Sequence, residues 1–198
     1  FGYGVAMRKS EARQRQAAVV DSLTGLLNRS KLSDRFEEVR QLAVARHESV
    51  ALLVCDLDHF KAVNDEHGHA AGDRVLVDTA MLLRAALAGH ELIYRLGGEE
   101  FVVIIAGADA ASAASNAERV RAAIATGRPG GVDVTISVGT AVAAGADLHY
   151  DALFGAADAA LYDAKHRGRD QAVTVVLAAG AVTEVDEHGG RLEQLRAA

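Results

Sequence analysis

Apolar residues occur in this chain in two patterns: short strand-like runs, among which residues 132–141 alternate apolar with small or polar residues, and longer stretches with helical spacing. The short runs are rich in β-branched and aromatic residues, which favour strands. They lie at residues 50–55, 91–96, 101–105, 132–141 and 173–177. The run at 50–55 is continuous and predicts a strand buried on both faces, whereas the run at 173–177 predicts a last edge strand.

The longer stretches have the three- and four-residue spacing of amphipathic helices. The first follows Asn28, a candidate N-cap, and extends to about His47. Its apolar face comprises Leu32, Phe36, Val39 and Ala43. Further helices are expected from about residue 73 to residue 88, over residues 109–125 and over residues 153–164.

The order of these elements indicates the fold class. After the first helix the chain is expected to form a strand, two helices, a β-hairpin, a helix, a strand, a helix and a strand. This order predicts an α+β fold, an α/β sandwich in which helices flank a mostly antiparallel central sheet, as in a ferredoxin-like palm. The Gly-Gly-Glu-Glu stretch at residues 97–100 lies in the central β-hairpin.

Segments of different character are expected on both sides of this domain. We expect an N-terminal linker or signalling helix over residues 1–20, the domain over residues 21–178 and a C-terminal tail over residues 179–198. In the tail, Gly189-Gly190 precedes a small helical or disordered end. Residues 1–9 fit either the end of a membrane helix with a basic cytoplasmic flank, Arg8-Lys9, or an ordinary linker.

Composition narrows the class of protein. The net charge of −6 argues against nonspecific nucleic-acid binding, because the phosphate backbone selects basic surfaces. Cys55 is the single cysteine and lies in an apolar run, which indicates a buried thiol and a reducing compartment. An anionic small molecule would need local basic side chains or a divalent cation.

The hairpin turn is the first candidate for chemistry. Gly97 and Gly98 permit positive φ and let a ligand approach the backbone. Because side chains alternate along a strand, Glu99 and Glu100 are expected to point opposite ways, one toward a ligand or metal and one supporting the turn. A solvated hairpin tip is the alternative.

Two aspartates follow the buried strand at its carboxyl end, where α/β sheets bind ligands. If the strand persists, Asp56 and Asp58 share one face, and their oxygen ligands suit magnesium. The backbone N–H groups of the following turn could hold phosphate. Alternatively, the paired aspartates cap the next helix.

Two further clusters also leave alternatives open. His67 and His69 suit either zinc or hydrogen bonds within a turn, and zinc would need a third ligand at metal spacing. The stretch Lys165-His166-Arg167-Gly168-Arg169 is either a basic helix terminus with a glycine C-cap or an anion clamp.

Six short motifs follow one another between residues 21 and 170. They are Asp21-x-Leu23-Thr24-Gly25-Leu26-x-Asn28-Arg29, Asp56-x-Asp58-x-Phe60-Lys61-x-x-Asn64-Asp65, Gly68-His69-x-x-Gly72-Asp73, Arg95-x-Gly97-Gly98-Glu99-Glu100-Phe101, Ser137-x-Gly139 and Ala157-Asp158-x-Ala160-Leu161-Tyr162-x-Ala164-Lys165-x-x-Gly168-Arg169. In this order they resemble the GGDEF family of diguanylate cyclases, whose fold is a nucleotidyl-cyclase palm.

The resemblance implies that two GTP molecules are condensed to cyclic di-GMP with release of two pyrophosphates. Each domain would hold one GTP, so a homodimer is needed for catalysis. Asp56, the carbonyl of Leu57 and Glu99 would hold Mg²⁺, for which Mn²⁺ is a possible substitute, and Glu100 would contribute to the same site. Glu99 is also the candidate base for the ribose 3′-hydroxyl, with Glu100 as the second catalytic candidate.

The resemblance also implies a set of substrate contacts. Asn64 and Asp73 would read guanine, and Asp73 would accept hydrogen bonds that adenine cannot donate. The β- and γ-phosphates would meet Lys61, Lys165, Arg169 and the backbone N–H groups of His59 and Phe60. Gly97 and Gly98 would let the nucleotide lie against the hairpin.

One departure from the family concerns regulation. Many members carry an Arg-x-x-Asp motif before the hairpin, where product binds and inhibits, whereas this chain has Ala88-Gly89-His90-Glu91. Inhibition through that site is therefore not expected, and Arg84 and Arg119 are the remaining candidates for product contacts.

Two alternatives to an active cyclase are a regulatory module that binds GTP or product without turnover, and a cyclase acting on adenine. We expect a bacterial cytoplasmic domain, with a membrane anchor left open, and a sensory domain upstream of it. Without that domain the chain is expected to be largely monomeric and weakly active. Nucleic acid is not an expected partner.

Overall fold

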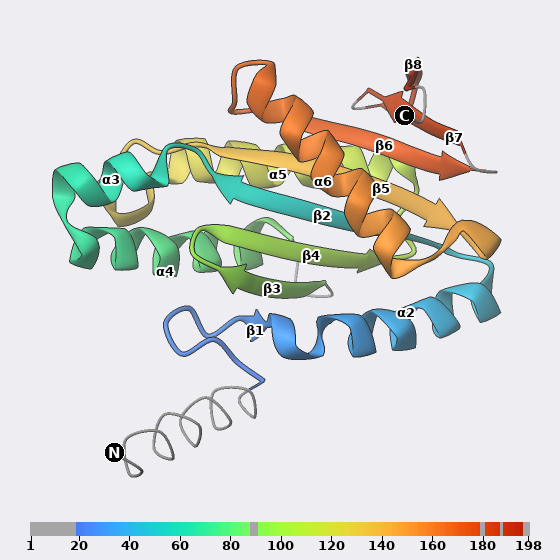
Figure 1. Ribbon diagram of the computed structural model, residues 1–198, viewed down its shortest axis with the longest axis horizontal. Helices are drawn as coiled ribbons and strands as arrows, with labels where there is room; N and C mark the ends of the chain where they lie inside the picture. The colour runs from blue at the N-terminus through green and yellow to red at the C-terminus, as the bar shows by residue number, and fades with distance from the viewer. Residues whose placement is uncertain (1–18, 88–90, 179–180, 187, 196–198) are drawn as a thin grey trace, which may run out of the picture.

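A mixed β-sheet forms the centre of the structure. The computed structural model describes residues 19–87, 91–178, 181–186 and 188–195. Within these residues, eight strands lie in the order β1-β3-β4-β2-β5-β6-β7-β8 (Figure 1). They are β1 (Leu27–Asn28), β2 (Ser49–Leu57), β3 (Leu92–Gly97), β4 (Glu100–Ala106), β5 (Ile136–Ala144), β6 (Ala172–Ala178), β7 (Ala181–Val185) and β8 (Arg191–Leu195). The pairs β1/β3 and β5/β6 are parallel, and the other neighbours are antiparallel.

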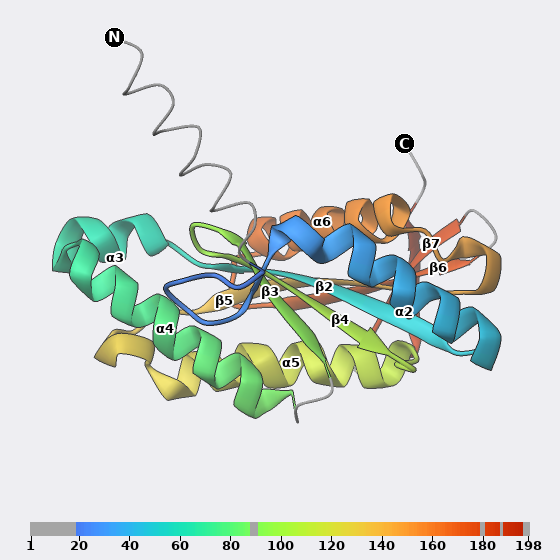
Figure 2. The same cartoon turned by 90° about the horizontal axis from the view of Figure 1, so that it is seen from below.

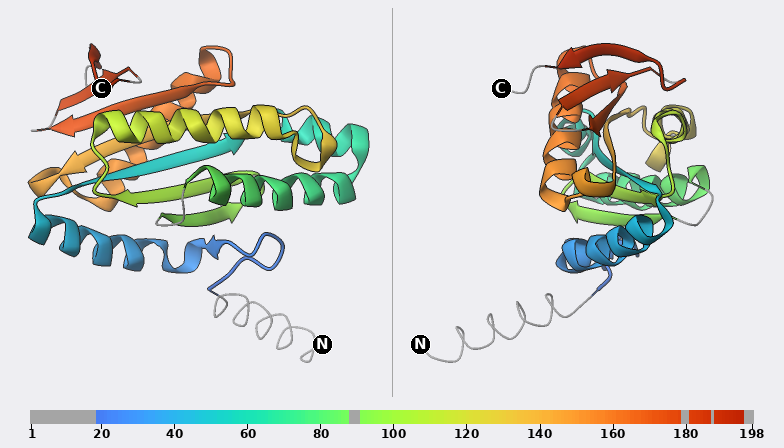
Figure 3. Two further views of the ribbon diagram at one scale, coloured as in Figure 1. Left: turned by 180° about the vertical axis from the view of Figure 1, so that it is seen from behind. Right: turned by 90° about the vertical axis from the view of Figure 1, so that its right-hand side faces the viewer.

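Helices cover both faces of this sheet, which confirms the expected α+β class. On one face lie α2 (Leu32–Arg46) and α6 (Tyr150–His166), and on the other lie α4 (His69–Ala86) and α5 (Ala110–Gly127) (Figure 2). The end-on view in Figure 3 shows α5 and α6 on opposite sides of the strands. Helix α3 (Phe60–His67) connects β2 to α4. Short 3₁₀ turns are η1 (Arg29–Lys31), η2 (Pro129–Gly131) and η3 (Gly145–Asp147).

The first helical segment begins at the expected residue. The side chain of Asn28 accepts a hydrogen bond from the N–H of Ser30 at 2.9 Å, which caps η1 ahead of α2. Leu32, Phe36 and Ala43 are buried on the face of α2 that packs against the sheet. The predicted apolar face of this helix is therefore confirmed.

Strand β2 lies between the two helical layers and is buried on both faces, as its continuous apolar run predicts. Leu52 and Val54 belong to the core cluster that contains residues of α2 and α6. Leu53 and Cys55 belong to the cluster that contains residues of α4 and α5. Cys55 is fully buried, and burial raises the pKa of its thiol to about 12. The expected buried thiol is thus confirmed.

Gly139 of β5 allows α6 to approach the sheet closely. A Cβ atom added there would lie 2.1 Å from the carbonyl oxygen of Ala157 and 2.1 Å from the nitrogen of Leu161. Both atoms belong to the α6 backbone, so a side chain at residue 139 would force the helix outward. This position therefore fixes the distance between α6 and the sheet.

The strand expected over residues 132–141 begins later than the pattern indicated, at Ile136, and ends at Ala144. Its partner β2 ends at Leu57, which pairs with Ile136. Residues 132–135 therefore have no strand residues of β2 to pair with. The apolar alternation of residues 132–135 predicted a strand but could not identify its partner.

The expectation that residues 173–177 form the last edge strand was wrong. Strand β7 pairs antiparallel with β6, and β8 pairs with β7 in the tail that was expected to be helical or disordered after Gly189-Gly190. Glu184 of β7 is buried because the Arg167 guanidinium donates to both of its carboxylate oxygens, at 2.6 and 2.8 Å. That partner lies 17 residues away, so local pattern could not reveal it.

Two expectations lie outside the described residues. One concerns the N-terminal linker or signalling helix, apart from Val19 and Val20, and the other the Ala88-Gly89-His90 departure. The division into a linker, a domain and a tail stays a prediction. Among the described helices, none is both long and apolar enough to cross a membrane.

The close approach at Gly139 generates a stability prediction. Gly139→Ala should lower the free energy of unfolding by about 3 kcal/mol, because the new methyl group meets rigid backbone. Gly155→Ala in α6 is the control, since its added Cβ meets nothing within 4 Å. That variant should gain about 1 kcal/mol from helix propensity. Urea unfolding followed by circular dichroism measures both, and equal stabilities would contradict the close-approach argument.

Candidate functional site

The carboxyl end of β2 meets the turn between β3 and β4. Asp56 lies directly opposite Glu100 of β4 on one side and opposite Ser137 of β5 on the other. The N–H of Leu57 donates to the carbonyl oxygen of Glu99 at 3.4 Å. The sheet register therefore places both glutamates of the turn beside the first aspartate.

Lysine from α6 completes this cluster. The Nζ atom of Lys165 lies 2.9 Å from Oδ2 of Asp56, and the two side chains are 31% and 13% exposed. Burial raises the pKa of the Asp56 carboxyl above its ordinary value, with a smaller contribution from the Glu99 charge, although Lys165 acts in the opposite direction. Burial followed by the charge of Asp56 also raises the pKa of Glu100.

Glu99 and Glu100 belong to different local structures. Strand β4 begins at Glu100, so Glu99 belongs to the turn and is not constrained by the strand pleat. The charge of Glu99 raises the pKa of Asp56, and the charge of Asp56 raises the pKa of Glu100. Their opposite orientation stays a prediction.

The donor set suits a hard divalent cation. Strand pairing places Asp56 opposite Glu100, the backbone of Glu99 meets that of Leu57, and Lys165 contacts Asp56. Among the described residues, no three His, Cys, Asp or Glu side chains form a complete metal site. Magnesium commonly binds through one or two carboxylates and takes its other ligands from water and substrate phosphates. The cluster fits that mode of binding.

The hairpin glycines adopt the conformations that the turn needs. Gly97 and Gly98 have φ of 151° and 54°, and a Cβ added to either would meet nothing within 4 Å. Arg95 holds this turn, since its guanidinium donates to the carbonyl oxygen of Gly98 at 2.8 Å and to Asp21 at 3.1 Å. The backbone of the turn is thus fixed while space stays open beside it.

The packing of α3 on α4 brings Asn64 against Gly72, the residue before Asp73. A Cβ added to Gly72 would lie 2.0 Å from Oδ1 of Asn64 and 3.2 Å from the ring of Phe60. The Asn64 side chain therefore lies over the first turn of α4. Asp73 itself is exposed.

The start of α3 provides the predicted backbone donors. His59 is the N-cap with φ of 55°, and the helix begins at Phe60. The first N–H groups of a helix have no acceptor within the helix, so they can bind an anion. Lys61 is exposed in the same turn.

His67, which the sequence offered as a zinc candidate, lies with its Nε2 3.9 Å from Oε1 of Glu66.

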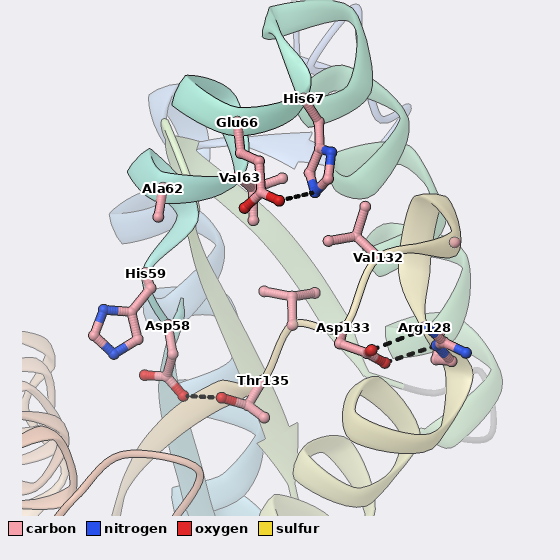
Figure 4. Close-up of a pocket in the computed structure, with 12 residues that line it drawn as sticks. Asp58, His59, Ala62, Val63, Glu66, His67, Arg128, Val132, Asp133 and Thr135 are labelled. Atoms are coloured by element: carbon pink, nitrogen blue, oxygen red, sulfur yellow. Dashed lines mark hydrogen bonds and ion pairs between the residues drawn. The ribbon is translucent and has the colours of Figure 1, made fainter.

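Asp58 does not join Asp56 in a magnesium site, contrary to the shared-face expectation. Its carboxylate is 4% exposed and accepts a hydrogen bond of 2.7 Å from Thr135 (Figure 4) and another of 2.7 Å from Ser137. It also accepts from the N–H of Asp170 at 3.0 Å. Because β2 ends at Leu57, the strand pleat no longer orients Asp58.

Sequence reasoning missed this role of Asp58. The available signal was a pair of hydroxyl residues spaced two apart, Thr135 and Ser137, in the run that would neighbour the strand before Asp58.

A cavity of about 490 Å³ lies beside Asp58, between α3 and the connection from α5 to β5 (Figure 4). Arg128 and Asp133 form an ion pair of 2.7 Å among its lining residues.

The chain is similar in sequence to diguanylate cyclases. The family model "Diguanylate cyclase, GGDEF domain" matches residues 18–171. Diguanylate cyclase DgcP of Pseudomonas aeruginosa is 43% identical over 167 residues, covering 80% of this chain and 24% of that protein. The chain thus spans about a quarter of that relative's length.

Solved structures give the same match. Diguanylate cyclase SiaD, crystallised with its activator SiaC from Pseudomonas aeruginosa, is similar with a TM-score of 0.72 and 37% identity, covering 87% of this chain and 67% of that one. The GGDEF domain of DgcB from Caulobacter crescentus, in complex with c-di-GMP, has a TM-score of 0.71 and 30% identity. That match covers 79% of this chain and 95% of the DgcB chain.

The raised pKa of Asp56 generates a prediction about stability and pH. A carboxyl whose pKa is raised by folding stabilises the fold when protonated, and this contribution is lost as pH rises through the folded pKa. Asp56→Asn, neutral at every pH, should therefore melt at a higher temperature than the parent at neutral pH. The difference should shrink as pH falls toward 3.8, the ordinary value for aspartate. Thermal melts followed by circular dichroism across this range measure it.

The same melts include a metal test and a control. Magnesium should raise the melting temperature of the parent and not that of Asp56→Asn, because a ligand stabilises only the state that binds it. Asp34→Asn, which breaks an exposed ion pair with Lys31, should change little at any pH. A parent that melts above Asp56→Asn at neutral pH without magnesium would contradict the argument.

Proposed function

This chain belongs to the GGDEF-domain family, and we propose that it is a diguanylate cyclase domain that condenses two GTP molecules to cyclic di-GMP and two pyrophosphates. The observation that carries the proposal is the meeting of Asp56, Glu99 and Glu100 with Lys165 at an open glycine turn. The sheet and its helices are consistent with the ferredoxin-like nucleotidyl-cyclase palm, in which most strand pairs are antiparallel.

The carboxylate cluster would hold Mg²⁺, or Mn²⁺ in its place. Its protein ligands would be Asp56, the carbonyl oxygen of Leu57 and Glu99, with Glu100 contributing. When bound, the cation neutralises the triphosphate and polarises the reacting phosphoryl group. The burial of Asp56 supports this assignment, because it raises the pKa of the carboxyl even with Lys165 beside it, so the ionised form is disfavoured in the absence of a cation.

The α3–α4 pair would read the base. Asp73 would accept from the N1–H and the exocyclic amine of guanine, and the amide of Asn64 would add a further hydrogen bond. Adenine offers no such pair of donors to a carboxylate, so Asp73 would disfavour it. The contact between Asn64 and Gly72 supports this arrangement because it holds the amide against the residue that precedes Asp73.

Positive groups would hold the β- and γ-phosphates. They are the side chains of Lys61, Lys165 and Arg169 and the N–H groups of His59 and Phe60. Lys165 is already within 2.9 Å of the proposed metal ligand Asp56, so it can contact phosphate oxygens bound to the same cation. Gly97 and Gly98 leave room for the nucleotide against the turn.

Glu99 would accept the proton of the ribose 3′-hydroxyl as that oxygen attacks the α-phosphate of the second GTP. The raised pKa of Glu100 makes it a stronger proton acceptor beside Glu99 once ionised. Since each domain has one such cluster, the second GTP would come from another copy of the chain. Catalysis would therefore require a homodimer.

Control of dimerisation would lie upstream. The chain spans 24% of DgcP, so a sensory domain in the complete protein and a role for residues 1–20 in aligning two copies are parts of the proposal. We place the domain on the cytoplasmic side, where GTP is available, and leave its anchoring to the complete protein. SiaD was crystallised with a protein activator, which supports regulation by a partner in this family.

The direct test is incubation of the purified chain with GTP and magnesium, with products separated by chromatography. GTP should give cyclic di-GMP, ATP should give no cyclic di-AMP, and Glu99→Gln should reduce the rate with GTP by at least about 100-fold. The chain should also be tested as a fusion to a dimerising coiled coil, because a monomer would be inactive. GTP binding without product in the fused form would favour a regulatory module instead.

The contact between Gly72 and Asn64 generates a second prediction. Gly72→Ala should displace the Asn64 amide, because the new methyl group would lie 2.0 Å from its oxygen. The KM for GTP should rise about tenfold, the value of one hydrogen bond, with little change in melting temperature because a flexible side-chain end moves. Gly155→Ala is the helical glycine control. An unchanged KM with a lowered melting temperature would contradict this role of Asn64.

A further inference from the structure

Asp58 binds two distant parts of the chain, residues 135–137 and the turn after α6, through one buried carboxylate. Its Oδ1 accepts from the hydroxyl of Ser137, and its Oδ2 accepts from the hydroxyl of Thr135 and from the N–H of Asp170. These donors belong to the start of β5, the segment before it and the turn after α6. All three are neutral, so they satisfy the carboxylate without offsetting its charge.

The turn that Asp58 holds has an uncommon backbone conformation. Gly168, Arg169 and Asp170 have φ of 117°, 65° and 47° in succession. The left-handed region is unfavourable for arginine and aspartate, so surrounding contacts must maintain it. The Asp58 carboxylate binds the N–H of Asp170, and Arg121 of α5 binds the Asp170 side chain at 2.7 Å.

Residues 165–170 are attached at both ends to the carboxyl end of β2. At the first end, Lys165 contacts Asp56 at 2.9 Å. At the second end, the N–H of Asp170 donates to Asp58, which follows Asp56 by two residues. Arg169 lies between these two attachments and is exposed. The Asp58–Asp170 hydrogen bond therefore helps to set its position relative to Asp56, together with the bond from the Arg169 N–H to the carbonyl oxygen of Ala164 at 3.1 Å.

We propose that Asp58 is a positioning residue that holds residues 168–171 in the conformation that presents Arg169 to the triphosphate of GTP. The inference rests on the proposed function, because it assumes that Arg169 meets phosphate. It assigns to Asp58 the role of acceptor for the Asp170 N–H, separate from the metal site that Asp56 would form. The hydrogen bond carries the effect, so a neutral acceptor at residue 58 can replace the carboxylate.

The test compares the affinities of GTP, GDP and GMP in the presence of magnesium, measured by calorimetry on the whole chain. Asp58→Ala should weaken GTP about tenfold, the value of one charge-assisted contact, and leave GMP within about twofold, since GMP lacks the outer phosphates. Asp58→Asn should bind GTP within about threefold of the parent. Its amide oxygen can accept from Thr135 and Asp170, while Ser137 accepts from its amide N–H.

Two further variants separate positioning from stability. Ser137→Ala removes one hydrogen bond to Asp58 but leaves the contact with Asp170, so the ratio of GTP to GMP affinity should stay within about twofold. Arg121→Gln breaks the outer support of Asp170 without altering the buried carboxylate. It should lower the GTP affinity and spare GMP, and it serves as the test if Asp58→Ala does not fold.

The outcomes distinguish this inference from the proposed function. Equal losses for GTP and GMP in Asp58→Ala, or an Asp58→Asn variant as weak as Asp58→Ala, would overturn the positioning role. So would a GTP affinity unchanged in both Asp58→Ala and Arg121→Gln. If the parent chain makes cyclic di-GMP and both Asp58→Ala and Arg121→Gln have the same KM for GTP as the parent, the positioning role is refuted and the proposed function stands. A parent that binds GTP no better than ATP would instead refute the proposed function.

Discussion

The burial of β2 on both faces is the constraint on which the site depends. Leu52 and Val54 contact one helical layer and Leu53 and Cys55 the other, so a charged side chain within this run would be desolvated without a partner. The first charge after the run, Asp56, accordingly lies at the end of the strand. There the pairing with β4 and β5 fixes its neighbours, and α6 supplies Lys165.

The position of α6 in turn depends on Gly139. Because the helix backbone approaches β5 so closely, Lys165 reaches Asp56 from the end of α6, and the following turn reaches Asp58. The cost of this arrangement appears in the raised pKa values of Asp56 and Glu100, which show that the folded protein disfavours their ionised forms. Such a cluster is unfavourable for stability alone and suits the binding of a cation.

Beyond the matched family region, the sheet continues. The family model ends at residue 171, whereas β7 and β8 extend the sheet past β6. The bidentate pair of Arg167 and Glu184 attaches β7 to the end of α6, between Lys165 and Arg169 in sequence. The C-terminal strands therefore support the segment that would bind phosphate, and their removal would leave Arg167 without this carboxylate.

Local patterns in the sequence specify the periodic elements and the residue types of the site. The apolar run at 50–55 identified a strand buried on both faces, the cap at Asn28 located the first helix, and the motifs pointed to Asp56, Glu99 and Lys165, because these signals are local. Which groups face each other depends on how distant segments pack. The fold separates Asp58 from Asp56, brings the Glu99–Glu100 turn beside the end of β2, and adds β7 through the pairing of Arg167 with Glu184. Each of these outcomes depends on partners from distant segments, whose distance and orientation no local pattern of residues encodes.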